Sequence, residues 1–407
     1  MKKIVIFGAG NIGRSFIGQL FSRSGYEVVF IDVDDKIVNA LNERRRYGIK
    51  IKDVNPETIW VENVRAVHGK DGERVAHEIA TAEVMATAVG PDNLPYIYPN
   101  IAVGLLERRR LKVGPIDIII CENVRDASGI FRDGISKHLP EDYPFDSLVG
   151  LVETSIGKMV PIMAEEERRK DPLLVFAEAY NTLIVDMKGF RGEIPKVKGL
   201  EAKENMAAYV DRKLFIHNMG HAVTAYLGYI TDPYMKYIWE ATNEKPIRRT
   251  VEEAMWESGR ALIAEYPKDF CEDDMKEHID DLIRRFSNEA LGDTIYRVGR
   301  DVPRKLSRND RLIGALLLDA KHGVRSPCTA LGAAAAVLFR GKDEKGKMYE
   351  KDRIFVEETY PHGIDFVLKE VCGLDLRRDG SLIDSIKKAY EFLMKDSRNW
   401  FSWLNIK

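Results

Sequence analysis

An amine, an amide and an imidazole lie within one short stretch of this chain, at Lys213, Asn218 and His221. On an α-helix, at about 100° per residue, His217 lies about 40° around the axis from Lys213, His221 about 80° and Asn218 about 140°, so all four can face one pocket. A desolvated lysine, whose pKa falls from about 10.4 towards 7 or 8, can remove a proton from an alcohol. Asn218 and His221 could then stabilise the alkoxide. We interpret the stretch as a reaction centre; the alternative is a solvated helix with satisfied histidines.

A glycine-rich loop near the start of the chain supplies the other half of an oxidoreductase. A strand pattern over residues 3–7 runs into GxGxxG and then into a helical pattern, which is the context that a dinucleotide-binding loop requires. The helix amino terminus faces the phosphates in such a loop. We therefore predict that the cofactor is held by the loop residues, Gly8, Ala9, Gly10, Asn11, Ile12 and Gly13.

Each of the three glycines has its own expected role: Gly8 permits the tight turn, Gly10 the approach of the backbone to the pyrophosphate, and Gly13 the close packing of the helix. A second strand pattern ends at Asp32, which would accept hydrogen bonds from the adenosine ribose and repel a 2′-phosphate. This predicts NAD rather than NADP. The alternative is a glycine-rich turn in an α/β protein that binds no dinucleotide.

Further buried-strand patterns occur at residues 83–90, 116–123, 148–154 and 173–178. Because the carboxyl ends of parallel strands line the cofactor crevice, we expect contacts with the nicotinamide half of NAD from Thr87, Val89, Gly90 and Asn123. The amide of Asn123 could also reach the reacting oxygen. An equally good interpretation is that Asn123 caps the following helix.

The pattern changes beyond about residue 195, where long helical segments replace strand-like runs. The sequence therefore predicts an α/β fold with two domains: a Rossmann-type NAD-binding domain at residues 1–195 and a mostly α-helical substrate domain at 196–407. We predict helices at residues 204–228, 231–265, 272–291, 307–322, 326–340, 363–371 and 382–396.

Composition narrows the choice of partners. The 407 residues are 45% hydrophobic and 31% charged with a net charge of −2, which gives no reason to expect a nucleic-acid or membrane partner. The four cysteines show no metal-binding spacing and no disulfide framework, and no signal peptide is evident. We expect a cytoplasmic protein without a metal site, acting on a small molecule as a monomer or small homo-oligomer.

A cluster of cations in the second half of the chain could clamp a phosphate with forked guanidinium groups. Its candidate substrate-binding members are Arg297, Arg300, Arg304 and Lys305. The cluster is interrupted by glycine and proline, as a loop would be. The alternative is a solvated loop with local ion pairs.

These stretches together resemble the polyol-specific long-chain dehydrogenases, the mannitol dehydrogenase family. The likeness covers nearly the whole chain, and K-x4-N-x2-H, formed by Lys213, Asn218 and His221, is its signature. Its other specific points are residues 7–14, 87–90, 121–123, 184–186 and 297–313. The last of these is close to the sugar-phosphate branch of the family. The resemblance implies metal-independent hydride transfer to NAD with Lys213 as base, and Asn123, Asn218 and His221 steadying the oxyanion or orienting the sugar.

The substrate implied by this branch is mannitol 1-phosphate, interconverted with fructose 6-phosphate. Two departures from the family pattern bear on it: Gly157-Lys158 replaces a usual Asp-Arg pair, and Thr182-Leu183 a usual Glu-Trp. Another hexitol phosphate, or a sugar acid of the altronate or mannonate type held by Arg297 and Arg300, therefore stays open. A non-catalytic NAD-binding sensor is a further alternative, which would not need Lys213.

Overall fold

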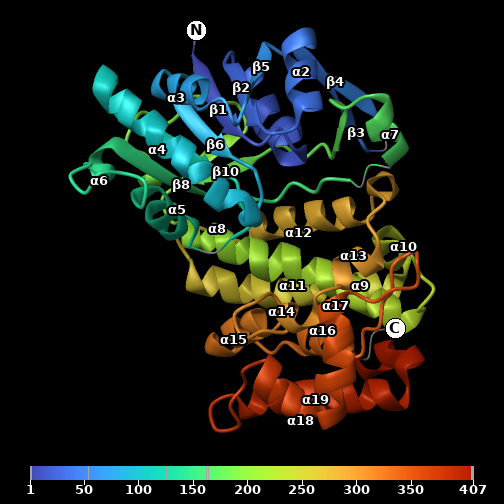
Figure 1. Ribbon diagram of the computed structural model, residues 1–407. Coiled ribbons are helices and arrows are strands. Elements are labelled where there is room, and N and C mark those ends of the chain that lie inside the picture. Colours follow the sequence, from blue (N-terminus) through green and yellow to red (C-terminus); the bar gives the residue numbers. More distant parts are fainter. Residues whose placement is uncertain (1, 54, 125, 162, 164, 405–407) are drawn as a thin grey trace. The chain divides into compact units, whose positions relative to one another are not determined.

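The computed structural model describes residues 2–53, 55–124, 126–161, 163 and 165–404. The chain forms two compact units, Met1–Met206 and Ala207–Lys407 (Figure 1). The sequence pattern predicts the domain boundary at residue 195, before the boundary that the structure has after Met206. Strand β11 (Leu200–Lys203) accounts for the difference, because it pairs in parallel with β10 (Leu183–Asp186) and so extends the sheet of the first unit.

An eight-stranded sheet organises the first unit, in the order β11-β10-β8-β7-β6-β1-β2-β5. The strands β8, β7, β6, β1, β2 and β5 run parallel to one another, whereas β10 is antiparallel to β8. The remaining strands are β1 (Lys3–Phe7), β2 (Glu27–Asp32), β5 (Val64–His68), β6 (Val84–Thr87), β7 (Ile116–Ile120) and β8 (Val149–Ile156). The order from β5 to β8 is that of a Rossmann fold, whose topological switch point lies between β1 and β6. The predicted fold class is thereby confirmed.

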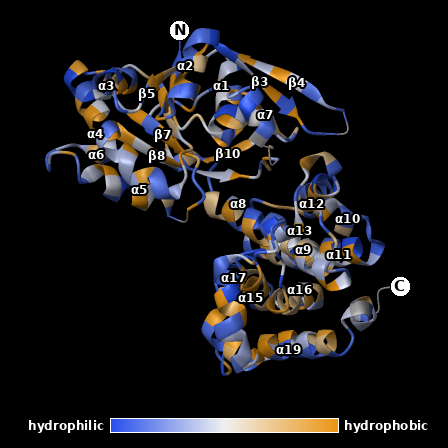
Figure 2. Cartoon of the chain, turned by 45° about the vertical axis from the view of Figure 1, so that its right-hand side comes forward, coloured by the Kyte–Doolittle hydropathy of each residue, from blue (hydrophilic) through white to orange (hydrophobic). Residues whose placement is uncertain are grey.

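Helices cover both faces of this sheet, because its strands are apolar on both sides. In β1, Ile4 and Ile6 belong to one buried cluster, while Val5 and Phe7 belong to the other. One cluster includes η1 (Gly13–Gly18), α1 (Gln19–Ser22) and α2 (Asp35–Arg44); the other includes α3 (Gly72–Ala80), α4 (Leu94–Leu111) and α5 (Ala127–Ser136). Figure 2 shows the central strands mostly in the hydrophobic colour. Burial on both faces explains their continuous apolar runs.

A second, three-stranded sheet in the first unit was not predicted. Strand β3 (Arg46–Ile51) pairs antiparallel with β4 (Glu57–Glu62) and parallel with β9 (Val175–Ala177). In β3 exposed Arg46 and Lys50 interrupt the buried residues, and in β4 only Val61 is buried, so the apolar signal of these short strands is weak. The predicted strand at 173–178 exists as β9, but it joins this small sheet and not the large one. The charged segment that precedes β9 forms α7 (Glu165–Lys170).

The second unit is built from helices around α9 (Met219–Thr231), which packs against α11 (Lys245–Glu265), α13 (Ile295–Gly299) and α16 (Pro327–Val337). From Met219 to Gly228, every residue of α9 except His221 is buried. The other longer helices are α8 (Met206–Arg212), α10 (Ile238–Asn243), α12 (Glu272–Phe286), α15 (Ile313–Lys321) and α19 (Gly380–Lys395). Short helices between them include α14 (Val302–Lys305) and α17 (Glu350–Ile354).

Two of the predicted helices are divided in the structure. The segment predicted at 231–265 forms α10 and α11, and α9 ends before Pro233, which lacks the N–H that would continue a helix. Pro246 lies in the first turn of α11, where proline is favoured. The segment predicted at 204–228 contains a π-helical turn, η4 (Lys213–Asn218), between α8 and α9.

No helix in the described part of the chain combines the length and the apolar character that a membrane span requires.

Candidate active site

The three glycines of the first unit's loop occupy distinct environments. Gly8 has φ +94, and a Cβ there would lie 2.5 Å from the carbonyl oxygen of Ala88. A Cβ at Gly13 would lie 2.0 Å from the Gly8 carbonyl oxygen, so the following π-helical turn η1 packs directly on the loop. A Cβ at Gly10 would meet no atom within 4 Å. The loop is therefore closed at Gly8 and Gly13 and open at Gly10, where a pyrophosphate needs room.

The carboxylate of Asp32 joins this loop to the end of β2. Its Oδ2 accepts a hydrogen bond from the Ala9 amide at 2.7 Å, and its Oδ1 accepts from the amides of Val33 at 2.7 Å and Asp34 at 3.0 Å. A carboxylate has about four lone-pair positions, so a ribose hydroxyl can still donate to it. Within the loop, Asn11 is exposed. These residues fit an NAD-type dinucleotide.

The loop after β6 is held by a residue that sequence reasoning missed. Both oxygens of the Glu122 carboxylate accept backbone hydrogen bonds at 2.9 Å, one from Val89 and one from Gly90. Burial raises the pKa of Glu122, and the two amides oppose this effect. The predicted contacts of Val89 and Gly90 with NAD therefore cannot use these two N–H groups. Thr87 is fully buried at the end of β6.

Asn123 lies just beyond β7 and is exposed. The residue at the amino-terminal cap of α5 is Asp126, and the amide of Ser128 in the first turn donates to the Glu153 carboxylate at 2.9 Å. The alternative in which Asn123 caps the helix is therefore not what the structure shows. Its side chain is open to a ligand at the carboxyl edge of the sheet.

In the second unit, the predicted reaction centre lies on the π-helical turn η4. Lys213 is its first residue and Asn218 its last, and the amide of Met219 donates to the carbonyl of Leu214, five residues earlier. In a π-helix, residues five apart lie about one turn apart. Asn218 is therefore closer to the side of Lys213 than the 140° of an α-helix would place it, because the wider turn changes the spacing.

The Lys213 amine is set up to lose its proton near neutral pH. Burial lowers the pKa of Lys213 to about 8, and the positive charge of Arg311 adds to this effect. Arg311 forms an ion pair with Asp310 at 2.8 Å, and its side chain is mostly buried. A partly buried amine beside a second cation is a recognised arrangement for a general base.

The His221 ring is fixed on two sides. It lies parallel to the ring of Phe286, with centroids 4.6 Å apart and an 8° interplanar angle. Its Nε2 lies 3.2 Å from Oδ2 of Asp293. Burial lowers the pKa of His221, although the Asp293 carboxylate opposes this. Burial thus disfavours the charged imidazole, and Nε2 lies within hydrogen-bond distance of the Asp293 carboxylate.

His217 also lies on η4 but differs from His221. It is 6% exposed, and its pKa falls well below the ordinary value because of burial and because of the nearby Arg285 guanidinium. Its ring packs near Phe286, 5.8 Å between centroids. We assign His217 a packing role beside the site.

Two of the four predicted substrate-binding cations are paired with carboxylates. Arg297 binds Asp293 through two hydrogen bonds, Nε to Oδ1 at 2.6 Å and Nη2 to Oδ2 at 2.5 Å. Arg304 bonds to Asp301 at 2.6 Å and to Asp310 at 3.2 Å. The local ion pairs of the alternative are therefore present for these two arginines, but Arg297 lies on α13 and Arg304 on α14, not on a loop.

Arg300 and Lys305 are different from these two arginines. Arg300 is exposed and lies near two tyrosine rings, 5.9 Å from the centroid of Tyr296 and 5.4 Å from that of Tyr349. Lys305 is 4% exposed, and its amine donates to the carbonyl of Arg300. Burial lowers the pKa of Lys305 to about 7. The buried amine thus holds the backbone from which Arg300 projects.

The two departures from the family pattern lie in the first unit. Lys158 is 7% exposed, its Nζ donates to Oδ1 of Asn181 at 3.0 Å, and it lies 5.1 Å from the centroid of the Phe16 ring. Leu183 begins β10 and is fully buried. Lys158 therefore keeps a buried cation at this position, whereas Leu183 contributes to the core.

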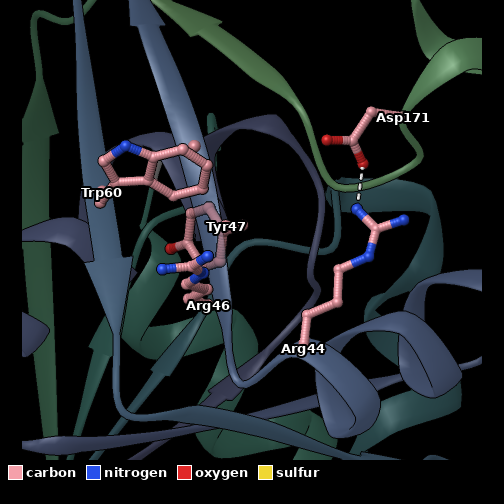
Figure 3. Close-up of a pocket in the computed structure, with 6 residues that line it drawn as sticks. Arg44, Arg46, Tyr47, Trp60 and Asp171 are labelled. Atoms are coloured by element: carbon pink, nitrogen blue, oxygen red, sulfur yellow. Dashed lines mark hydrogen bonds and ion pairs between the residues drawn. The ribbon is translucent and has the colours of Figure 1, made fainter.

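A cavity of about 290 Å³ lies between the small sheet and the end of α2 (Figure 3). Arg44 forms an ion pair with Asp171 at 2.7 Å on one side, and on the other the Arg46 guanidinium lies 5.1 Å from the centroid of the Trp60 ring. Helix α2 begins shortly after Asp32, the last residue of β2, whereas this cavity lies at the carboxyl end of α2. It is separate from the glycine loop.

Comparison with known proteins identifies the family. Residues 2–199 match the mannitol dehydrogenase Rossmann domain, and residues 205–394 match the mannitol dehydrogenase C-terminal domain. The chain belongs to the mannitol dehydrogenase family, which confirms the resemblance predicted from the sequence.

Curated relatives agree with this assignment, and solved structures share the fold. A mannitol-1-phosphate 5-dehydrogenase of Brevibacillus brevis is 38% identical over 82% of this chain and 85% of its own length. One from Geobacillus stearothermophilus is 35% identical over 96% of this chain and 99% of its own. The fold is shared with Pseudomonas fluorescens mannitol 2-dehydrogenase (TM-score 0.71, 15% identity, 99% and 94% coverage) and with a D-sorbitol dehydrogenase (0.79, 15%, 98% and 94%).

Sequence reasoning missed three residues that shape the sites. Asp293 precedes Arg297 by four residues, a spacing typical of helical ion pairs, but it also reaches His221, which no local pattern indicates. Phe286 and Glu122 act across the fold on His221 and on the β6 loop. Only the tertiary structure identifies these contacts.

Proposed function

We propose that this protein is an NAD-dependent dehydrogenase that interconverts mannitol 1-phosphate and fructose 6-phosphate in the cytoplasm. The observation that carries the proposal is the partly buried amine of Lys213, with a pKa lowered to about 8, on the same π-helical turn as Asn218. The relatives named mannitol-1-phosphate 5-dehydrogenase, similar over nearly their full length, support the choice of substrate.

NAD would bind along the loop from Gly8 to Gly13. The pyrophosphate would lie over Gly10, where the backbone is open, and the adenosine ribose would donate to Asp32. The same carboxylate would repel a 2′-phosphate, which favours NAD over NADP. When bound, NAD supplies the nicotinamide ring that accepts hydride from the alcohol carbon.

The residues of this chain would manage the proton and the developing charge. Neutral Lys213 would take the hydroxyl proton at its Nζ, and in the reverse direction return it to the alkoxide. The side-chain amides of Asn218 and Asn123 would donate hydrogen bonds to the oxyanion. His221, neutral with its Nε2–H directed to Asp293, would accept a hydrogen bond from another substrate hydroxyl through Nδ1.

For the substrate phosphate we propose Arg300 and Arg297. Arg300 is exposed beside two tyrosine rings, and Arg297 offers a guanidinium oriented by Asp293. Lys305 would act indirectly, because its amine donates a hydrogen bond to the Arg300 carbonyl. Arg304 would attract the phosphate through its positive charge. Forked guanidinium groups bind a phosphate more strongly than they bind a neutral hydroxyl group.

The test is NADH formation by the purified protein with mannitol 1-phosphate, sorbitol 6-phosphate, free mannitol, altronate and mannonate. We expect mannitol 1-phosphate to give the highest kcat/KM, with free mannitol lower by at least about a hundredfold because it lacks the charged contact. Activity on a sugar acid but on neither hexitol phosphate would contradict the proposed substrate and reassign Arg297 and Arg300 to a carboxylate. Failure to bind NAD at all would contradict the dehydrogenase itself.

A further inference from the structure

The Asp293 carboxylate contacts two groups of the proposed reaction centre at once. Its Oδ2 lies 3.2 Å from Nε2 of His221 and 2.5 Å from Nη2 of Arg297, and its Oδ1 accepts from Nε of Arg297 at 2.6 Å. Asp293 as a whole is 7% exposed. A carboxylate so deeply placed is costly unless it is paired, and both of its partners here are predicted to face substrate.

The turn that carries Asp293 is fixed by backbone contacts. Gly292 before it adopts a left-handed conformation at φ +60, and the side chain of Thr294 after it accepts a hydrogen bond from the amide of Arg297. The carbonyl of Asp293 accepts from the amide of Ile238 at 2.9 Å. The carboxylate therefore has a defined position relative to α13 and its Arg297.

The contact with His221 decides which ring nitrogen carries the proton. A carboxylate accepts hydrogen bonds and does not donate them, so Nε2 must be the protonated nitrogen when the ring is neutral. This leaves Nδ1 as an acceptor. Phe286, stacked on the ring face at 4.6 Å, restricts rotation of the imidazole, so the two contacts fix both its orientation and its tautomer.

We propose that Asp293 is a positioning residue of the reaction centre: its carboxylate holds His221 as the Nε2–H tautomer, so that Nδ1 accepts a hydrogen bond from a substrate hydroxyl, and holds the Arg297 guanidinium in one orientation. This inference rests on the proposed function. It assigns His221 to recognition of a polyol hydroxyl beside the reacting carbon, and it leaves oxyanion stabilisation to Asn218 and Asn123. Asp293 itself touches neither substrate nor cofactor.

The first experiment is a double-mutant cycle with mannitol 1-phosphate and NAD. Asp293→Asn preserves the shape of the side chain but removes the charge, and its amide can donate to Nε2 and reverse the tautomer. We expect kcat/KM to fall about 10- to 100-fold, as for loss of a charge-assisted hydrogen bond, with NAD affinity unchanged. In a His221→Ala background, the same change should cost less than in the wild type, because only the Arg297 contact is then left to lose.

A matched control separates positioning from a general structural effect. Asp379 binds Arg308 at 2.7 Å, and the side-chain exposures of this pair, 8% and 33%, resemble the 8% and 38% of Asp293 and Arg297. Asp379→Asn therefore removes a similar ion pair with no histidine contact, and we expect kcat/KM to change less than twofold. An equal loss from Asp293→Asn in the wild-type and His221→Ala backgrounds would overturn the proposal.

The second experiment does not depend on the substrate. The ¹⁵N chemical shifts of the His221 ring, identified by their absence in His221→Ala, should show the Nε2–H tautomer at pH 7 in the wild type and its loss in Asp293→Asn. A wild-type Nδ1–H tautomer would overturn the positioning role. If the tautomer is as expected while no hexitol phosphate is oxidised, the proposed substrate fails and the role of Asp293 stands.

Discussion

The glycine loop of the first unit and the lysine turn of the second are built in opposite ways. The loop is made of backbone: its function follows from where a Cβ can and cannot fit, as at Gly13, 2.0 Å from the Gly8 carbonyl, and at Gly10, in open space. The lysine turn is made of side chains whose chemistry depends on burial. The amine of Lys213 has an ordinary pKa in water and one of about 8 in the fold. A motif fixes the first kind of site, whereas packing fixes the second.

Removing the amine should produce the largest effect and separates the two sites most directly. We expect Lys213→Ala to lower kcat about 10³-fold, within the range for loss of a general base, while NADH binding measured by fluorescence stays within twofold. The matched control is Lys321→Ala, which removes a surface lysine paired with Glu265 and should leave kcat unchanged. Partial rescue by a small primary amine would strengthen the assignment, and a variant with most of its activity would exclude Lys213 as the base.

The glycines allow the roles of fold and ligand to be divided within one loop. Gly13→Ala should lower the free energy of unfolding by about 1–3 kcal/mol, because the new methyl group overlaps the Gly8 carbonyl. Gly10→Ala should leave the melting temperature of the cofactor-free protein unchanged but raise the Kd for NAD at least about tenfold, because its methyl group fills the pyrophosphate space.

Gly380→Ala is the control for both variants, since a Cβ there also meets no atom within 4 Å and the position lies at the start of α19, in the second unit. It should change neither melting temperature nor Kd. Unchanged NAD affinity in Gly10→Ala would show that the pyrophosphate does not lie over this residue.

The smallest expected effect concerns pH and sharpens the account of the lysine turn. Because the folded pKa of Lys213 is about 8, the neutral amine needed for alcohol oxidation is scarce below that pH. We expect kcat/KM for oxidation to rise about tenfold per pH unit and level off above about 8, whereas ketone reduction, which needs the protonated amine, should fall above 8.

Arg311→Met should move this inflection upward, because the arginine charge helps to lower the pKa of Lys213. An inflection that stays in place in this variant would mean that burial alone sets the pKa. An inflection near 10 in the wild type would contradict a desolvated amine.

The sequence by itself determined the class of fold and the cofactor loop. Continuous apolar strands, GxGxxG between a strand and a helix, and an acid ending the second strand are local features, and each needs only neighbouring residues to be meaningful. The same holds for the helical second half and for K-x4-N-x2-H, whose spacing is visible without a structure. The hairpin β3–β4 was not predicted because most of its exposed residues are polar.

Only the tertiary structure decided how these residues act. It converted the predicted α-helical arc into a π-helical turn, placed Arg311 beside Lys213, and directed the Nε2–H of His221 to Asp293. It also showed that Arg297 and Arg304 are paired with carboxylates, which a count of cations does not reveal. The physical reason is that a pKa, a tautomer and the availability of a charge depend on groups that lie far apart in the chain and come together only on folding.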